Sequence, residues 1–530
     1  MAITMTDRSA RETSSTSTVT TTVVPTSTAQ EDERTRNKKE SQKTTADYDK
    51  LVHQLTPHPL AEKLKFAIGC SQLAVFGWYT AINIAVTTFA EYCDKKLFKS
   101  DLVGKIGHHA NTTFGSKSRI SRRFVRYPDE DSFMVPTFFW LGFVLPAWFF
   151  YELWLTYTTE MVYPFRIFIY NAVRLGPMYC NFMYVYVLAH KEGHLNGNLL
   201  NLKFSIPILN PFSTSSNKAS SKKEINFQFP FNHWVGMFHG VVPGTFTISH
   251  IFNHHRHENS YQDVYCTAYR PRDSFKNFVK YLPSWFCYSS NLSTIWFFLT
   301  AENKKERKQK KAFELIFWTT YYFLFILACF SLSKSTAIFT SATLIFAFFE
   351  ANILLAMVNW VWHGFIDEED PTNAYVNSTT IVDGLNFTLK EEYHVVHHQY
   401  PGIHWSKHEQ MYEKHEKEYK EKCGGNKTQK PATTPAEKEQ ELKQIIENNP
   451  NKRIIATGFH NQNLFEIFGM MVGQEYGKLA DLFYQPFNKQ DLSRDEIAEL
   501  LKRRLQYHGP EVALRIGGVE RKDFLNKKGE

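Results

Sequence analysis

Apolar and charged segments alternate through the middle of this 530-residue chain. Five apolar segments are long enough to cross the hydrocarbon core of a bilayer, which is about 30 Å thick. They cover residues 66–90, 133–158, 161–189, 312–332 and 337–362. Only a few residues separate the second segment from the third and the fourth from the fifth, and so short a turn forces an antiparallel pair. The pattern predicts an all-α integral membrane protein with two transmembrane helical hairpins and one extra N-terminal span.

Basic segments beside these helices predict their orientation. Residues 91–132 and 301–311 are rich in lysine and arginine, and such segments remain in the cytosol. Both hairpins then enter the membrane from the cytosol and return to it, while the orientation of the span 66–90 stays open. The apolar segment 285–301 lies between two stretches assigned to the cytosol, so we expect an interfacial or re-entrant helix there.

The two ends of the chain differ in character from the middle. Residues 1–62 are rich in Ser and Thr and nearly free of aromatic residues, which predicts a disordered tail. The remaining boundaries are expected at residues 63–408 for the membrane domain, 409–452 for a charged linker and 453–530 for a small soluble helical appendage. Within the appendage, Ser493 and Glu496 have the spacing of a capping box at the start of a helix.

Composition excludes some classes of function, and a short C-terminal motif indicates the compartment. Lys and Arg total 61 against 53 Asp and Glu, and this balance is too weak to indicate nucleic-acid binding. Seven cysteines without a Cys-x-x-Cys pair exclude a disulfide scaffold and a zinc ribbon. Lys527 and Lys528 match the cytosolic dilysine retrieval signal of endoplasmic reticulum membrane proteins, so we expect that membrane and a cytosolic C-terminus.

Histidine clusters are the strongest chemical signal in the sequence. Three boxes contain His190 and His194, then His250, His254 and His255, then His394, His397 and His398. Each box follows or precedes an apolar segment, and residues four apart on a helix share one face. At the chain's own histidine content, the His-x-x-His-His pattern of the third box is expected only about 0.03 times by chance. The boxes therefore predict a metal site at the cytosolic edge of the membrane.

The number of histidines limits the kind of metal site. Eight imidazoles exceed the three or four ligands of a mononuclear zinc site and suit two metals. Imidazole alone is compatible with zinc, copper, iron or nickel, so the ligand type leaves the metal open. A ferritin-like carboxylate site would need two Glu-x-x-His pairs, and near the boxes only Glu391 and His394 have that spacing.

The layout of the three boxes and two hairpins, over about residues 133–405, resembles the membrane fatty acid desaturase/hydroxylase superfamily. The resemblance implies a di-iron catalytic domain at residues 63–408, with two Fe per chain that activate O2 and the eight box histidines as iron ligands. Asn359 and His363 have the Asn-x-x-x-His spacing of the acyl-CoA desaturase branch. By that resemblance His363 is a ninth ligand and Asn359 holds a metal-bound water.

Other polar residues near the boxes have open roles. His257 follows the second box and leaves its ligand set uncertain by one residue. Carboxylates commonly orient ligand imidazoles through the free ring N–H. The candidates for this role are Glu192, Glu258, Asp263 and Asp367.

The leading prediction is an O2-dependent membrane oxygenase that hydroxylates or epoxidises a long apolar lipid. Because a branch of the superfamily acts as an alternative squalene epoxidase, squalene epoxidation in sterol biosynthesis is a candidate. The alternatives are a fatty acyl desaturase, a zinc-dependent membrane hydrolase, and a non-enzymatic membrane sensor of metal or lipid. The chain has neither a His-Pro-Gly-Gly haem segment nor a Gly-x-Gly-x-x-Gly loop, so we expect electrons from a separate NAD(P)H-dependent reductase or cytochrome.

Overall fold

The structure is a computed structural model, and the part of the chain that it describes has gaps. The described residues are 48–97, 99, 119–176, 179–197, 199–200, 203–208, 221–226, 229–368, 370–382, 384, 388–414, 457–460, 463–483, 492–506 and 509–519. Residues 54–519 form one compact unit, which contains every histidine box. Most of the predicted tail and linker, and both lysines of the dilysine signal, lie outside the described residues.

Three helices are long and apolar enough to cross a membrane, within the described ranges. The first covers α7 (Met134–Phe139), η3 (Trp140–Val144) and α8 (Leu145–Thr159). The second is α15 (Gln309–Phe330), and the third covers α16 (Lys334–Thr340), η7 (Ser341–Ile345) and α17 (Phe346–Trp362). They confirm the predicted apolar helices at 133–158, 312–332 and 337–362. Ser333 caps α16 directly after α15 ends, so the second hairpin turns within a few residues, as expected.

The predicted span at 161–189 is wrong as a single helix. The chain instead forms α9 (Pro164–Leu175) and α10 (Cys180–His194), separated at Gly176, whose φ of 70° lies in the left-handed region. At 1.5 Å per residue α9 is only about 18 Å long, too short to cross the bilayer core. The Gly176-Pro177 pair favours a break in a helix. The prediction of one span considered only the apolar length of the segment and overlooked this pair.

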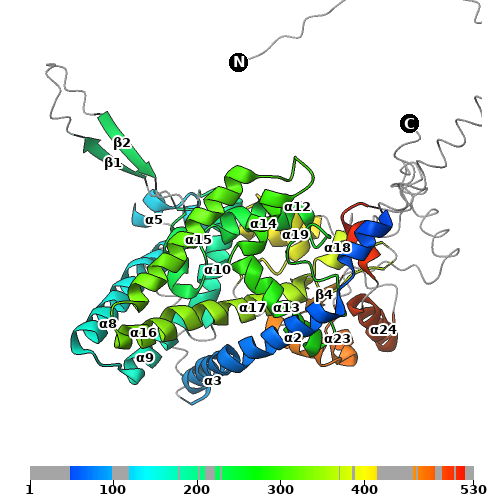
Figure 1. The fold of residues 1–530 in the computed structure, drawn as a ribbon, viewed down its shortest axis with the longest axis horizontal. Helices are drawn as coiled ribbons and strands as arrows, with labels where there is room; N and C mark the ends of the chain where they lie inside the picture. The colour runs from blue at the N-terminus through cyan, green and yellow to red at the C-terminus, as the bar shows by residue number, and fades with distance from the viewer. Residues whose placement is uncertain are drawn as a thin grey trace, which may run out of the picture. The chain divides into compact units, whose positions relative to one another are not determined.

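The N-terminal run is helical, but its membrane crossing stays a prediction. It consists of α2 (Pro59–Gln72), η1 (Leu73–Gly77) and α3 (Trp78–Tyr92), followed by η2 (Cys93–Leu97). Figure 1 shows α2 beside α13 (Phe275–Ser289), and these two helices contact closely. At Gly69 a Cβ atom would lie 2.0 Å from the Val279 carbonyl oxygen, so only glycine permits this approach. The expected interfacial helix at 285–301 is divided between α13 and α14 (Leu292–Thr300).

A buried ion pair joins the membrane helices. Arg174 Nη2 of α9 lies 2.7 Å from Glu350 Oε2 of α17, and both side chains are fully buried. Asn83 of α3 donates a second hydrogen bond of 2.8 Å to the same carboxylate. Removing one partner of such a pair typically costs about 3–5 kcal/mol, because the other charge stays buried and unpaired. The pair therefore holds α3 and α9 against α17.

The C-terminal region is helical, as predicted, but it is part of the main unit rather than an appendage. Its elements are β4 (Gly458–His460), α22 (Leu464–Val472), α23 (Tyr476–Asp481), α24 (Arg494–Leu505) and α25 (Pro510–Ile516). β4 pairs in parallel with β3 (Thr380–Val382). The side chains of α22 and α24 share one hydrophobic core with Phe278 and Trp360. The capping box of Ser493 and Glu496 is present.

The remaining elements connect the membrane helices to the histidine boxes. They are α5 (Arg119–Phe124), α6 (Pro128–Asp131), β1 (Lys203–Ile208), β2 (Ser221–Asn226), α11 (Pro230–His233), η5 (Val235–His239), η6 (Thr245–His254), α12 (His255–His257), α18 (Ala374–Asn377), α19 (His394–Gln399) and η8 (Trp405–Lys407). β1 and β2 pair antiparallel, a hairpin that the apolar pattern did not predict.

Candidate metal centre

Four separate segments bring nine histidines together. The end of α10 carries the first box, η6 and α12 carry the second, α19 carries the third, and His363 directly follows α17. η6 is a π-helix, in which hydrogen bonds join residues five apart. His250 and His255 are therefore brought onto one face, whereas His254 is directed to another. Segments far apart in the sequence supply the site, which is formed only by the tertiary fold.

Five of these histidines form a first group. Its members are His190, His194, His250, His255 and His397, and the ring nitrogens of the group all lie within 4.8 Å of one another. Nε2 of His255 lies 3.0 Å from Nε2 of His250 and 3.0 Å from Nε2 of His397. Nε2 of His190 lies 3.0 Å from that of His194 and 2.6 Å from that of His250. Every member therefore directs a nitrogen to one point.

The other four histidines form a second group beside the first. His254, His363 and His398 have ring nitrogens within 4.8 Å of one another. His394 joins them, because its Nε2 lies 3.0 Å from that of His363 and 3.1 Å from that of His398. All nine histidines predicted to bind metal thus fall into two groups, of five and of four.

The chemistry of both groups fits bound cations. Metal–nitrogen bonds of about 2.0–2.1 Å at right angles place neighbouring ligand nitrogens about 3 Å apart, the spacing seen here. Burial and the neighbouring imidazoles hold the pKa of His255 and of His397 well below the ordinary histidine value. The rings are therefore neutral near pH 7, which is the form that binds metal. Neutral nitrogens that face one another repel through their lone pairs, and a cation between them would remove that repulsion.

Carboxylates and a carbonyl hold the histidines from outside. Asp263 Oδ2 lies 2.8 Å from His254 Nδ1, the orienting contact that its position near the second box suggested. The Asn377 carbonyl oxygen lies 3.1 Å from His363 Nδ1. Since both oxygens accept a hydrogen bond from the Nδ1–H group, the proton stays on Nδ1 and the Nε2 lone pair is directed into the second group. Glu258 is more distant, at 3.7 Å from His398 Nδ1.

Glu391 is the residue that sequence reasoning missed. Its Oε2 lies 3.0 Å from His397 Nδ1 and 3.4 Å from His190 Nδ1, so one carboxylate contacts ligands from two boxes. Its other oxygen pairs with Lys191, and all of these side chains are buried. In the sequence Glu391 stood out only as half of a Glu-x-x-His pair with His394, and that spacing does not predict contact with His190 and His397.

Three residues near the boxes do not have the roles we considered. Glu192 accepts hydrogen bonds of 2.9 Å from the backbone N–H groups of Phe231 and Asn232, so it holds α11 rather than a histidine. His257 lies outside both groups, with Nε2 3.3 Å from Glu306 Oε2. The second box therefore contributes three histidines to the site. Asp367 accepts a hydrogen bond of 3.3 Å from the Asp370 backbone N–H.

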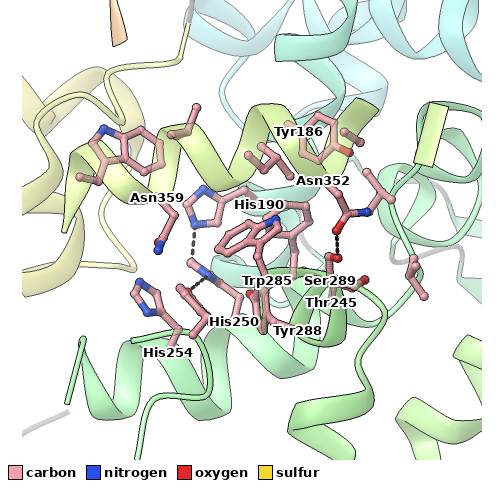
Figure 2. A pocket seen from close by; sticks show the side chains of 18 of the residues that line it. Tyr186, His190, Thr245, His250, His254, Trp285, Tyr288, Ser289, Asn352 and Asn359 are labelled. Atoms are coloured by element: carbon pink, nitrogen blue, oxygen red, sulfur yellow. Dashed lines mark hydrogen bonds between the residues drawn. The ribbon is translucent and has the colours of Figure 1, made fainter. Parts of the chain in front are cut away.

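An apolar pocket begins at the two histidine groups. Its walls include Val241, Phe246, Leu355 and Val358, and Trp285 lies between its two ends (Figure 2). His190, His250, His254, His363 and His394 form the boundary at one end. A mostly apolar pocket with a few polar groups at one end is typical of a binding site for an apolar ligand.

Asn359 lies at this boundary, where Figure 2 shows its side chain directed towards His254. Its Nδ2 donates a hydrogen bond of 2.9 Å to the Tyr281 hydroxyl, which leaves its Oδ1 for a further partner.

We predict that Asn359→Ala lowers turnover about tenfold, since an outer contact to a bound water is lost and no ligand is removed. Steady-state oxidation rates measure this. The control is Ser290→Ala, which lies outside the pocket lining and should keep the wild-type rate; loss of metal from Asn359→Ala would contradict the prediction.

Residues 220–425 match the family model described as fatty acid desaturase. The match includes the second and third boxes and His363, and it supports the resemblance to the membrane fatty acid desaturase/hydroxylase superfamily. No curated protein and no solved structure matches the chain significantly.

Proposed function

We propose that this chain is an O2-dependent di-iron enzyme that oxidises a long apolar lipid, and the match of residues 220–425 to the fatty acid desaturase family model supports this. The observation that carries the proposal is the pair of histidine groups at one end of an apolar pocket. Iron bound in both groups would supply the activation of O2 against an inert C–H or C=C bond. The family match favours desaturation over the hydroxylation or epoxidation that we first expected.

The protein's own residues prepare the site for that chemistry. Val241, Phe246 and Leu355 exclude water and hold a lipid chain next to the histidines. Asp263 and Glu391 fix the orientation of the imidazole rings. Desaturation converts one O2, two electrons and two protons into two waters while two hydrogens leave the lipid. The chain therefore needs an external source of electrons.

We place the docking site of a separate reductase or cytochrome on the basic loop between α14 and α15. Lys304 and Lys305 of this loop are exposed, as is Lys310 at the start of α15. Arg256 Nη2 of α12 lies 2.5 Å from Glu306 Oε1, so an ion pair connects this loop to the second box. An acidic donor would be steered to the loop by complementary charge, and added salt should weaken the effect. The second surface expected to bind the donor, residues 95–126, lies mostly outside the described residues.

Topology is a further prediction, with the endoplasmic reticulum as the expected membrane. A tag placed after Glu530 should be digested when protease is added to sealed microsomes, because the boxes and the C-terminus face the cytosol. A second tag in the turn between α15 and α16, at residues 331–333, should be protected. Protection of the C-terminal tag together with digestion of the turn would show the opposite orientation.

The reaction is tested by expression in two yeast strains, one without its acyl desaturase and one without squalene epoxidase. Growth of the first strain is the expected result and supports desaturation, whereas growth of the second would favour epoxidation. His255→Ala is the control and should restore neither. If neither strain grows but the purified chain consumes O2 with an alkane or isoprenoid, hydroxylation is the reaction. If no lipid supports O2 consumption by metal-loaded protein that is supplied with an electron donor, the proposed enzyme activity is refuted and a sensor becomes the better account.

A further inference from the structure

The end of the pocket away from the histidines is polar, although one of its walls is α17, part of a helix apolar enough to cross a membrane. Asn352, Ser289 and Thr245 line this end, and Figure 2 shows the first two side chains directed towards one another. Asn352 precedes Asn359 by seven residues on α17, which places it about 10 Å further along the helix axis. The two asparagines lie on the same side of the helix and mark the two ends of one pocket.

The polar end keeps some hydrogen-bonding capacity. The Ser289 hydroxyl donates to Asn352 Oδ1, and Asn352 Nδ2 donates a bond of 2.7 Å to the Phe348 carbonyl oxygen. A side-chain amide has two N–H donors and two acceptor positions. These contacts therefore leave Asn352 with one donor and one acceptor position at the pocket wall. Thr245 is already bonded to Asn291 Oδ1, at 3.0 Å.

Packing alone does not account for this arrangement. A polar side chain within a membrane helix is costly and typically marks a binding or transport site. The backbone at residues 240–244 is also non-helical, and such backbone is tolerated at membrane depth only where it is buried or lines a cavity. Gly240 approaches α17 so closely that a Cβ atom would lie 2.6 Å from the Ala347 carbonyl oxygen. This irregular segment lines the pocket with Asn352.

The electrostatics of the pocket limit which group could bind. Among the described residues that line it, none is Asp, Glu, Lys or Arg. A carboxylate or an ammonium group would be buried there without a counter-ion, at high cost. A neutral oxygen, by contrast, can accept a hydrogen bond from Asn352, and a hydroxyl can also donate one.

We propose that the substrate is a lipid with a neutral oxygen, a hydroxyl or a carbonyl, about two helical turns from the carbon that is oxidised. Asn352 and Ser289 bind this oxygen and thereby determine which carbon faces the histidines. The substrate class is then an oxygenated lipid rather than a pure hydrocarbon. Only the statement about the oxidised carbon rests on the proposed function; the binding of the oxygen does not.

Binding of three C18 probes to the full chain in nanodiscs tests this proposal. The probes are octadecane, 1-octadecanol and 2-octadecanone, and each displaces 1-bromooctadecane, whose bromine quenches tryptophan fluorescence. The pocket signal is the part of the quenching that is lost in a Trp285→Phe background, since Trp285 lies in the pocket wall. We expect the wild type to bind the alcohol or the ketone about tenfold more tightly than the alkane, the effect of one well-formed hydrogen bond. A preference for both probes identifies donation by Asn352, and a preference for the alcohol alone identifies its acceptor position.

The variants decide whether Asn352 and Ser289 cause the preference. Asn352→Leu should reduce it to less than about twofold without weakening alkane binding. Ser289→Ala should reduce it partly and serves as the test if Asn352→Leu fails to fold. The matched controls are Thr343→Val on the same membrane helix and Ser290→Ala beside Ser289, both outside the pocket lining. Equal affinity of the wild type for all three probes, or full preference in both pocket variants, overturns the proposal. Because the assay needs no turnover, an intact preference in an inactive protein would refute only the proposed function.

Discussion

Replacing His255 by alanine should abolish lipid oxidation while the membrane helices stay folded. Nε2 of His255 lies 3.0 Å from the corresponding atoms of both His250 and His397, so its loss opens the centre of the five-histidine group. Removing an outer partner of a ligand typically costs 10- to 100-fold in metal affinity or activity. Removing the ligand itself should cost more, and we expect turnover to fall at least about 100-fold. Oxidation rates in microsomes, with the membrane-bound amount of protein quantified, measure this loss.

His233→Ala is the matched control for that variant. His233 is stacked on Trp318, with ring centroids 3.8 Å apart, and it belongs to neither histidine group. Its replacement should leave turnover within about twofold of the wild type, since no metal contact changes. The account would be contradicted if His255→Ala kept a tenth or more of the wild-type rate, or if both variants lost activity equally.

Glu391→Gln should weaken metal binding by about 10- to 100-fold. The carboxylate contacts His397 and His190 in the five-histidine group, and it neutralises the buried Lys191. Glutamine keeps the size of the side chain but removes the charge, so Lys191 is left buried without a counter-ion. Competition with a chelator measures the affinity without any need for turnover.

The adjacent Glu392 supplies the control for this change. Its side chain is buried as well, but it contacts no histidine of either group in the described part of the chain. Glu392→Gln should therefore leave metal affinity within about twofold of the wild type. An equal loss in both variants would mean that burial of charge near the third box matters, and that contact with His397 does not.

The sequence alone predicted the parts of this protein that depend on local patterns. Apolar length identified the helices at 133–158, 312–332 and 337–362, and histidine spacing identified the eight box histidines. His363 was added through the resemblance to the acyl-CoA desaturase branch. Spacing was sufficient because a shared helix face brings residues four or five apart together. It could not assign each histidine to a group, since His254 and His255 are adjacent but belong to different ones.

Contacts between segments far apart in the chain could not be predicted from the sequence alone. The Glu-x-x-His spacing of Glu391 and His394 did not predict the contacts of Glu391 with His190 and His397, because those contacts depend on where α10 and α19 meet. The C-terminal helices were expected to be separate, since their helical pattern carried no information about the surface of α17 on which they pack. Asn352 stands inside an apolar segment, where one polar residue does not alter the prediction of a membrane helix. Only the folded pocket shows that it lies at the end opposite the histidines.

Metal analysis of the freshly purified full chain tests the central claim most directly. Two histidine groups, of five and of four rings, predict about two iron atoms per chain. The His255→Ala variant should retain less iron, and His233→Ala should retain the wild-type amount. One zinc per chain without iron, or no bound metal in protein prepared with iron and without chelator, would contradict the assignment of the site.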